Sequence, residues 1–512
     1  MLATLVLVLL AMVVLGALLA DRLMPAASGP PSHVLPVQAD ATELDRTVAP
    51  LLAAHPGQSG AILVNDGLDA FAVRALATRG AGRSLDLQYY MWHDDLCGRL
   101  LALEVWRAAE RGVRVRLLLD DMNAYGLDPQ LLELDRHPNV EIRLYNAFRN
   151  RNGIRRVFET LVRALRINHR MHNKAWIADG RMAIVGGRNI GEEYFDTAQD
   201  TNFRDLDVAL LGPAVGEAET IFDRYWNDPS AVPLHALADK NAGRVQRSMA
   251  DLENRVGGDK ARAYLARVLA SPGVAEFMTG TRSPIWSTGI EVVADPPQKW
   301  NRDDRQQWLV RRLVEAIGSA RAQAWLISPY FVPGENGTQQ LVGLSHDGVD
   351  VGVVTNSLAA NDVPAVHSGY ARYRTPLLAG GVKLYELRAK GHTETSGLFG
   401  SSGASLHTKA FIVDGRRGFI GSFNMDMRSA ALNTEMGVLF DDPRIGAALA
   451  TEYQRLAGPA LSYVVQLEPD GDLRWVDGTT QPPRILDQEP DASLGRRVAA
   501  RVLGWLPIES QL

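Results

Sequence analysis

The chain has 512 residues, 46% of them hydrophobic and 22% charged, which is the composition of a globular protein with a full core. The formal net charge of −5 gives no general argument for or against binding of nucleic acid. A single cysteine, Cys97, excludes an intrachain disulfide and a cysteine-rich metal site. The length suits roughly two to four domains, and an internal repeat in the chain favours two.

The stretch from Leu2 to Ala20 carries no charged residue and is long enough to span the hydrocarbon of a bilayer. It predicts a membrane anchor over residues 1–24, followed by a linker over residues 25–45. A cleaved secretory signal is the alternative, although the basic residues that usually begin such a signal are absent. Arg22 alone does not decide which face of the membrane the chain occupies.

Strands and helices alternate over a predicted first domain at residues 46–235. The expected elements are a strand at 85–90, a helix at 99–111, a buried strand at 113–120, a strand at 140–145 and a hairpin at 174–187. The hairpin turns at Asp179-Gly180, a pair typical of tight turns. This alternation predicts an α/β sandwich.

A basic stretch precedes the hairpin. From Arg143 to Lys174 there are nine arginines and lysines and one acidic residue, Glu159. Such a stretch suits an anionic substrate, and it is equally typical of a solvated helix face.

The second half repeats the pattern, with strands at 325–331, 347–354 and 381–385 and a hairpin at 410–421. We therefore expect a second domain at residues 286–462, packed on the first about a pseudo-two-fold axis. Residues 236–285 have no counterpart in the second half. Their helical pattern predicts an insertion that would either cover the site or join the domains.

Residues 463–512 form an expected C-terminal extension. From Leu494 to Leu506 the apolar residues have helical spacing and the arginines lie elsewhere, which predicts an amphipathic basic helix. That helix would lie on a bilayer surface or dock on the protein's own core.

One motif occurs in both halves with the same spacing. The first copy is His172, Lys174, Asp179 and Asn189, and the second is His407, Lys409, Asp414 and Asn424. Side chains two residues apart on a strand point to the same face, so each copy offers an imidazole and an ammonium group to one site. These groups, together with a Gly-rich turn and a carboxamide, suit a phosphate ester.

The paired motif resembles the signature of the phospholipase D superfamily. Residues 86–90, 117–121, 170–174, 186–195, 205–207 and 506–509 are similar to bacterial cardiolipin synthases, in particular those of type C. The resemblance implies two α-β-α sandwich domains with the active site at their interface. It implies a catalytic set of His172, Lys174, Asp179, His407, Lys409 and Asp414, and a phosphate-binding set of Asn189, Asn424 and Ser422.

Two imidazoles at one phosphodiester can divide the chemistry. One attacks phosphorus while neutral and forms a phosphohistidine, and the other gives a proton to the leaving alcohol. Spacing does not decide which imidazole attacks, and the resemblance implies His172 as nucleophile and His407 as acid and base. The other nitrogen of such an imidazole is usually held by a carboxylate. For that role the resemblance implies Asp205 and Glu435, with Asp207 as the competitor of Asp205.

Two features of the motif have simpler interpretations. Asp179 and Asp414 precede glycine in both hairpins, so their first interpretation is structural, in forming the turns. Ser422 has no hydroxyl counterpart, because Gly187 occupies its place in the first copy, so the two copies would contact phosphate unequally. The lysines and asparagines can bind the non-bridging oxygens, and the sequence predicts a site without metal ion or cofactor.

The resemblance implies a phosphatidyltransferase that makes cardiolipin from phosphatidylglycerol and a second phospholipid, either phosphatidylethanolamine or phosphatidylglycerol. Hydrolysis to phosphatidic acid is the alternative, since spacing cannot partition the intermediate between water and an alcohol. A nuclease would need a long basic groove with stacking aromatic residues, and a non-enzymatic tether would have lost part of a motif. The expected partners are phospholipids and the bacterial inner membrane, and not nucleic acid.

Overall fold

The computed structural model describes residues 31–124, 127–148, 168–237, 249–299, 302–389, 403–506 and 509–511. The predicted anchor at residues 1–24 lies outside these ranges, as do residues 149–167 of the basic stretch. No helix within the described ranges is long and apolar enough to cross a membrane.

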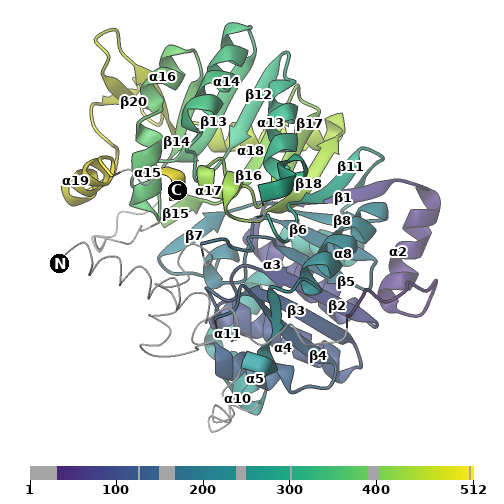
Figure 1. The fold of residues 1–512 in the computed structure, drawn as a ribbon. Helices are drawn as coiled ribbons and strands as arrows, with labels where there is room; N and C mark the ends of the chain where they lie inside the picture. The colour runs from purple at the N-terminus through teal and green to yellow at the C-terminus, as the bar shows by residue number, and fades with distance from the viewer. Residues whose placement is uncertain are drawn as a thin grey trace, which may run out of the picture.

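Two sheets organise the described chain, one in each half (Figure 1). The first has the order β10-β1-β8-β6-β5-β2-β3-β4-β9. Its strands are β1 (Ser59–Val64), β2 (Ser84–Tyr89), β3 (Arg114–Asp120), β4 (Val140–Tyr145), β5 (Ala175–Ala178), β6 (Met182–Gly186), β8 (Asp207–Leu211), β9 (Ala231–Pro233) and β10 (Ile285–Ser287).

The second sheet has the order β11-β18-β17-β16-β12-β13-β14-β19-β20-β21. Its strands are β11 (Ile290–Ala294), β12 (Gln323–Ile327), β13 (Asp350–Asn356), β14 (Lys383–Leu387), β16 (Lys409–Val413), β17 (Arg417–Gly421), β18 (Met436–Asp441), β19 (Ser462–Leu467), β20 (Leu473–Asp477) and β21 (Arg484–Leu486).

The two sheets share one topology. Apart from β10 in the first and β20 and β21 in the second, strands of the same rank pair in the same order. The directions agree as well: β2, β3 and β4 are parallel, as are β12, β13 and β14, and every other pair of neighbours in this shared set is antiparallel. The predicted repeat of a whole α/β domain is therefore confirmed.

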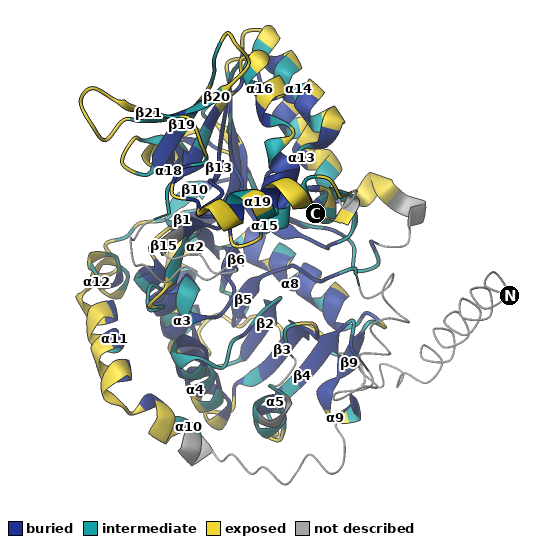
Figure 2. Ribbon diagram, turned by 90° about the vertical axis from the view of Figure 1, so that its left-hand side faces the viewer, coloured by how far each residue is buried: buried dark blue, intermediate teal, exposed yellow. Residues whose placement is uncertain are grey.

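Helices cover both faces of each sheet, as the α-β-α prediction required (Figure 2). On the outer faces lie α3 (Gly67–Gly80) and α4 (Leu96–Glu110) in the first domain, and α13 (Leu309–Gly318), α14 (Gly334–His346) and α16 (Arg374–Ala379) in the second. On the inner faces, α8 (Pro213–Trp226) and α18 (Pro443–Ala457) share one core that continues across the domain boundary.

The central strands show why the sequence reads as continuously apolar there. In β3, Leu117 and Leu119 enter the outer core while Leu118 enters the core shared by both domains. Successive side chains of a strand point to opposite faces, so a strand covered on both faces needs apolar residues at successive positions. The same shared core receives Ile177 from β5 and Ile412 from β16, and it holds the two repeats together.

Both predicted hairpins form, and an aspartate fixes each turn. Asp179 and Asp414 have φ angles of 53° and 51°, in the left-handed region that Asp tolerates better than most residues. The carboxylate of Asp179 accepts hydrogen bonds from the amides of Gly82, Arg83 and Ser84 at 2.9, 2.7 and 2.8 Å. Asp414 likewise accepts from residues 321–323, at 2.8 to 3.1 Å. Each hairpin is thus attached to the start of the neighbouring strand, β2 or β12.

The described part of the insertion consists mainly of α10 (Met249–Val256), α11 (Asp259–Ala270) and α12 (Pro272–Thr279). These helices lie on α3 and α4, on the outer layer of the first domain (Figure 1). Tyr264 of α11 donates a hydrogen bond to the carbonyl of Phe195 at 3.0 Å. The insertion therefore thickens the outer helical layer of that domain.

The predicted domain boundaries need two corrections. Strand β10 pairs with β1, so residues 285–287 return to the edge of the first sheet, and the second sheet begins at β11 rather than at 286. Strand β19 pairs with β14 and is followed by β20 and β21, so the second sheet continues beyond residue 462. In both places, edge pairing extends a sheet beyond the repeated unit.

Replacement of Asp179 tests the turn interpretation. Asp179→Ala removes the acceptor of three amide donors, of which that of Ser84 is buried, and should lower the free energy of unfolding by about 2–4 kcal/mol. Asp179→Asn keeps one acceptor oxygen and tolerates positive φ, so its loss should be smaller. Urea unfolding followed by circular dichroism measures both variants. Equal midpoints for wild type and Asp179→Ala would contradict the interpretation.

Candidate active site

The first histidine is placed by a backbone pairing between the domains. Thr434 of the second domain donates its amide hydrogen to the carbonyl of Arg170 (N to O 2.8 Å). His172 then donates its own amide hydrogen to the carbonyl of Thr434 (2.9 Å). The segment that carries His172 is therefore held directly beside Glu435, the residue that follows Thr434.

The second histidine is placed in the same way on the other side of the pseudo-two-fold. Strand β15 (Gly403–Leu406) runs parallel to β7 (Thr201–Arg204) of the first domain. His407 continues this pairing by donating its amide hydrogen to the carbonyl of Arg204 (2.8 Å). Asp205, the next residue, is thereby brought beside His407.

Each imidazole is held by the acid of the other repeat. The Nδ1 atom of His172 lies 2.8 Å from Oε2 of Glu435, and Nδ1 of His407 lies 2.6 Å from Oδ2 of Asp205. Both carboxylates are fully buried. Because Nδ1–H donates to a carboxylate, the lone pair of Nε2 stays available for chemistry. The competitor Asp207 takes no part, since its carboxylate pairs with the guanidinium groups of Arg74 and Arg188.

The two lysines of the motifs are buried in the same place. Both are 1% exposed, and neither forms an ion pair within the described part of the chain. Lys174 donates to the carbonyl of His172 at 2.7 Å, and Lys409 donates to the carbonyl of His407. Burial lowers the pKa of Lys174 to about 7 and that of Lys409 to about 8. Two desolvated ammonium groups of this kind make a binding position for an anion.

The electrostatics of the two imidazoles follow from this burial. Burial, and then the charges of Lys174 and Lys409, hold the pKa of His172 well below its usual range. Burial and Lys409 lower the pKa of His407 to about 4. Both imidazoles are therefore neutral at pH 7 in the free site, and a bound anion that offsets the lysine charges would raise both pKa values.

The two carboxylates differ from each other. Burial raises the pKa of Glu435 to about 7, against the attraction of Lys174. Burial also acts to raise the pKa of Asp205, but His407 and Lys409 outweigh it and hold that pKa below its usual value. Asp205 is therefore fully ionised beside its imidazole, whereas Glu435 is only partly ionised near neutral pH.

The structure brings the predicted phosphate ligands near the site in unequal states. The carboxamide of Asn189 is engaged by the protein: Oδ1 accepts from the amide of Met91 at 3.2 Å, and Nδ2 donates to the hydroxyl of Tyr194 at 2.9 Å. Oδ1 of Asn424 is buried and has no hydrogen-bond partner among the described residues. The unpaired atom of Asn424 is therefore an acceptor, which can meet a donor of a ligand but not a phosphate oxygen.

The hydroxyl of Ser422 supports Glu435 and is not directed to a phosphate. It donates to Oε2 of Glu435 at 2.5 Å and accepts from the amide of Met436 at 2.9 Å, so the expectation of a phosphate ligand is corrected here. At the matching position Gly187 is required, because a Cβ there would lie 2.2 Å from Oδ1 of Asp205. The asymmetry between serine and glycine thus follows from the different acids that they face.

Three features that the sequence analysis singled out do not lie beside the two imidazoles. Asp179 and Asp414 lie at the far ends of their hairpins, with their carboxylates taken up by backbone amides, and the structure does not bring them to the imidazoles. The described arginines of the basic stretch, Arg143 and Arg170, are buried and paired with Glu141 and Asp120. These two arginines do not contribute an exposed basic surface.

Aromatic side chains that the sequence analysis did not single out line both imidazoles. The ring of Tyr90 meets His172 edge-on at 5.1 Å between centroids, and Phe203 stacks on His407 at the same distance. Tyr194 meets His407 edge-on at 5.2 Å. Phe203 lies two residues before Asp205, and this strand spacing was the available signal.

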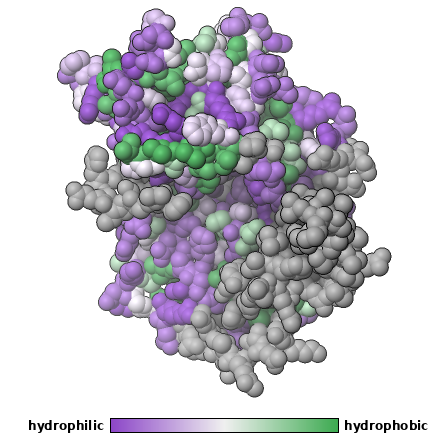
Figure 3. Space-filling model, turned by 60° about the vertical axis from the view of Figure 1, so that its left-hand side comes forward, coloured by the Kyte–Doolittle hydropathy of each residue, from purple (hydrophilic) through white to green (hydrophobic). Residues whose placement is uncertain are grey.

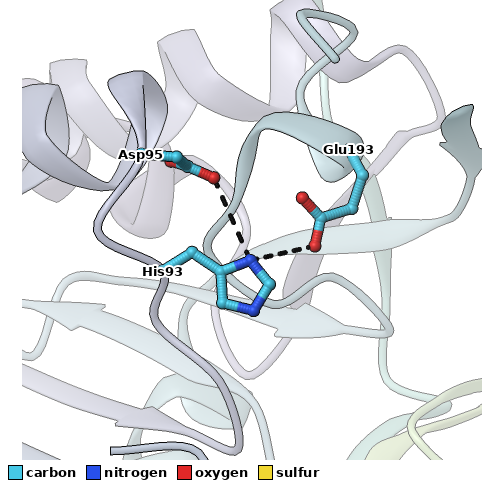
Figure 4. A group of neighbouring side chains, drawn as sticks. All are labelled: His93, Asp95 and Glu193. Atoms are coloured by element: carbon cyan, nitrogen blue, oxygen red, sulfur yellow. Dashed lines mark ion pairs between the residues drawn. The ribbon is translucent and has the colours of Figure 1, made fainter. Parts of the chain in front are cut away.

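Away from the two imidazole pairs, the side chains of His93, Asp95 and Glu193 lie close enough together to bind one metal ion (Figure 4). Nδ1 of His93 lies 3.2 Å from Oε1 of Glu193 and 4.0 Å from Oδ2 of Asp95. Asp95 also caps α4 through the amide of Gly98. The hydrogen bond to Glu193 raises the pKa of His93, so an ion pair accounts for the contacts. Spacing could not reveal this group, because Glu193 comes from a distant segment.

Comparison with known families agrees with this geometry. A model described as "Cardiolipin synthase, PLD-like domain" matches residues 77–226 and 313–457, one segment in each repeat. The chain belongs to this phospholipase D-like family. Its two matched segments contain both histidines and both acids of the site.

Individual relatives of the phospholipase D-like family match most of the chain. Cardiolipin synthase C of Escherichia coli is 40% identical over 470 residues, covering 91% of this chain and 99% of the relative. A cardiolipin synthase of Staphylococcus aureus is 25% identical over 391 residues, covering 76% of this chain and 65% of the relative. The crystal structure of a phosphatidylserine synthase from Haemophilus influenzae aligns with a TM-score of 0.56 at 12% identity, over 91% of this chain and 99% of that one. That last likeness shows the shared fold.

Binding of sulfate should report the lysine charges. Lys174 is a cation below its pKa of about 7 and loses the proton above it, so affinity for sulfate should fall as pH rises from 6 to 9. The fall should approach about tenfold per pH unit on the alkaline side. Isothermal titration calorimetry in two buffers should also show proton uptake on binding at pH 8.

Two variants control that experiment. Lys174→Met should bind sulfate weakly and with a flatter pH dependence. Lys383→Met, which removes an exposed lysine of β14 paired with Asp350, should behave as wild type. An unchanged pH profile in Lys174→Met would show that another group carries the dependence.

Proposed function

We propose that this chain is a phosphatidyltransferase that makes cardiolipin from phosphatidylglycerol and a second phospholipid, phosphatidylethanolamine or phosphatidylglycerol. The observation that carries the proposal is the pair of imidazoles, each hydrogen-bonded to a buried carboxylate, beside two buried lysines. The extent of the likeness to cardiolipin synthase C of Escherichia coli supports phospholipids as the substrate class.

In the first step, Nε2 of His172 attacks the phosphorus of the donor phospholipid. A P–N bond forms, the P–O bond to the headgroup breaks, and His407 gives its proton to the departing alcohol oxygen. In the second step, His407 takes the proton of the acceptor hydroxyl as that oxygen attacks phosphorus. The P–N bond breaks and its electron pair returns to His172.

The asymmetry of the acids supports this assignment of roles. His407 faces the ionised Asp205, which stabilises a protonated imidazole and suits an acid and base. His172 faces Glu435, whose pKa of about 7 makes it a weaker stabiliser of positive charge. A neutral imidazole with a free Nε2 is the form that attacks phosphorus.

The phosphodiester completes the electrostatics of the site. Its non-bridging oxygens would lie between Lys174 and Lys409 and accept their hydrogen bonds. The negative charge then offsets the lysines, so the pKa of His407 rises and this residue can carry the proton for the leaving group. We also propose that the chain works at the bacterial inner membrane, held there by the apolar segment 2–20.

Product analysis tests the reaction. Purified protein in vesicles of phosphatidylglycerol and phosphatidylethanolamine should form cardiolipin with EDTA present, because the proposed steps use only side chains of this chain. Thin-layer chromatography with labelled phosphatidylglycerol measures the product. Phosphatidic acid as the sole product would instead identify a hydrolase, in which water resolves the intermediate.

Replacement of each histidine tests the division of labour. His172→Ala and His407→Ala should each lower cardiolipin formation by about 10³-fold or more. His137→Gln is the matched control, since His137 faces Glu110 on the outer helical layer and should leave the rate unchanged. When the reaction of the wild-type protein is quenched without acid, mass spectrometry should find the phosphatidyl group on the peptide that contains His172. A fully active His407→Ala would overturn the two-imidazole scheme.

A further inference from the structure

Helix α19 (Leu494–Leu503) presents an apolar row to solvent. Leu494, Val498 and Val502 are 71%, 54% and 48% exposed, and they lie four residues apart, on one face of the helix. Trp505, just beyond the helix, is 78% exposed and continues the row. Figure 3 shows a continuous apolar strip on the surface of the second domain.

The opposite face of α19 attaches the helix to the protein. Arg496 is 8% exposed, and its Nε donates to the carbonyl of Leu358 at 2.9 Å. Its guanidinium group also donates to the carbonyl of Asn361. Ala500 completes this face, which packs near α15 (Pro364–Ala371).

This orientation is the reverse of the usual one. An amphipathic helix on a globular protein normally turns its apolar face to the core. Here an arginine and small residues face the core while leucine, valine and tryptophan face outward. The sequence analysis left open whether this helix lies on a bilayer or docks on the protein's own core. The structure shows it docked on the protein through Arg496 and Ala500, and this docking leaves the apolar row exposed.

The charges around the row indicate what covers it. Arg501 is exposed and Arg497 is partly exposed, and each follows a residue of the row by three positions. No acidic residue occurs between Leu494 and Leu506. A strip that combines large apolar side chains with positive charge alone matches the surface of an anionic bilayer.

The C-terminal region is also connected to segments that adjoin the site residues. The loop that Arg496 holds runs into Asp362, whose carboxylate accepts from the hydroxyl of Tyr330 at 2.8 Å. Further along the chain, Gln511 accepts from Nδ2 of Asn168 at 2.5 Å, four residues before His172. The C-terminal segment thus spans from α19 to the segment that carries the proposed nucleophile (Figure 1).

From these observations we infer that α19 is a membrane-docking helix. It lies on the surface of an anionic phospholipid bilayer, with Leu494, Val498, Val502 and Trp505 among the acyl chains and Arg497 and Arg501 at the headgroups. Docking there holds the second domain, which carries His407 and Glu435, at the lipid surface. The identity of the lipid as substrate rests on the proposed function, whereas the docking itself does not.

Fluorescence of Trp505 gives a local test in the full chain. Vesicles of phosphatidylglycerol and phosphatidylethanolamine with brominated acyl chains should quench part of the tryptophan emission. Trp505→Phe should abolish that part, although the chain has ten tryptophans. Total vesicle binding is not the readout, because the apolar segment 2–20 is expected to bind vesicles on its own.

The second test measures enzymatic turnover and varies the lipid composition of the vesicles. Val498→Gln with Val502→Gln should remove the quenching of Trp505 and lower turnover of vesicle lipid about tenfold. Turnover of monomeric short-chain phosphatidylglycerol should stay within about twofold, because the chemistry is untouched. Arg501→Gln should weaken quenching about fivefold on anionic vesicles and little on phosphatidylcholine vesicles. Leu269→Gln, at a site 64% exposed on α11, is the control and should change neither readout.

Two results would overturn the inference. In the first, Trp505 stays unquenched while sedimentation shows the chain on the vesicles. In the second, the protein forms a dimer without lipid that Val498→Gln with Val502→Gln dissociates, which would assign the row to a second copy. If no phospholipid is turned over but Trp505 is quenched as expected, the proposed function fails and the docking helix stands.

Discussion

Backbone pairing between the two domains is the constraint on which the site depends. His172 is hydrogen-bonded to Thr434 and His407 to Arg204, so each histidine is aligned with the residue that precedes the opposite acid. One domain alone would hold an imidazole and an ammonium group, but its carboxylate is the one that binds the imidazole of the other domain. The shared apolar core and these pairings therefore make the fold and the site a single cooperative arrangement.

The second consequence of this arrangement is electrostatic. Lys174 and Lys409 are buried and form no ion pair with the carboxylates of the described residues, and this burial costs free energy that an anion between them offsets. The same burial keeps both imidazoles neutral in the free protein. The free site therefore favours binding of an anion. The two histidines differ in the ionisation of the carboxylate that each contacts, Glu435 or Asp205.

Local elements were predictable where a short stretch determines its own geometry. The hairpin at Asp179 followed from a turn pair between two apolar runs, and the structure has it in the predicted place. Boundaries were less accurate, because β10 and β19 join sheet edges and no periodicity within a strand says which edge it will find. The resemblance implied a phosphate-binding role for Ser422, and only the tertiary structure shows that its hydroxyl contacts Glu435.

By itself the sequence determined the repeated α/β domain and the two motif copies with their histidines and lysines, since strand periodicity and spacing act within one segment. The tertiary structure decided that Glu435 serves His172 and Asp205 serves His407, because that exchange depends on how the two repeats pack. It also decided which face of α19 is outward, since helical spacing defines an apolar row but not its partner. Packing across the pseudo-two-fold is the information that no single stretch contains.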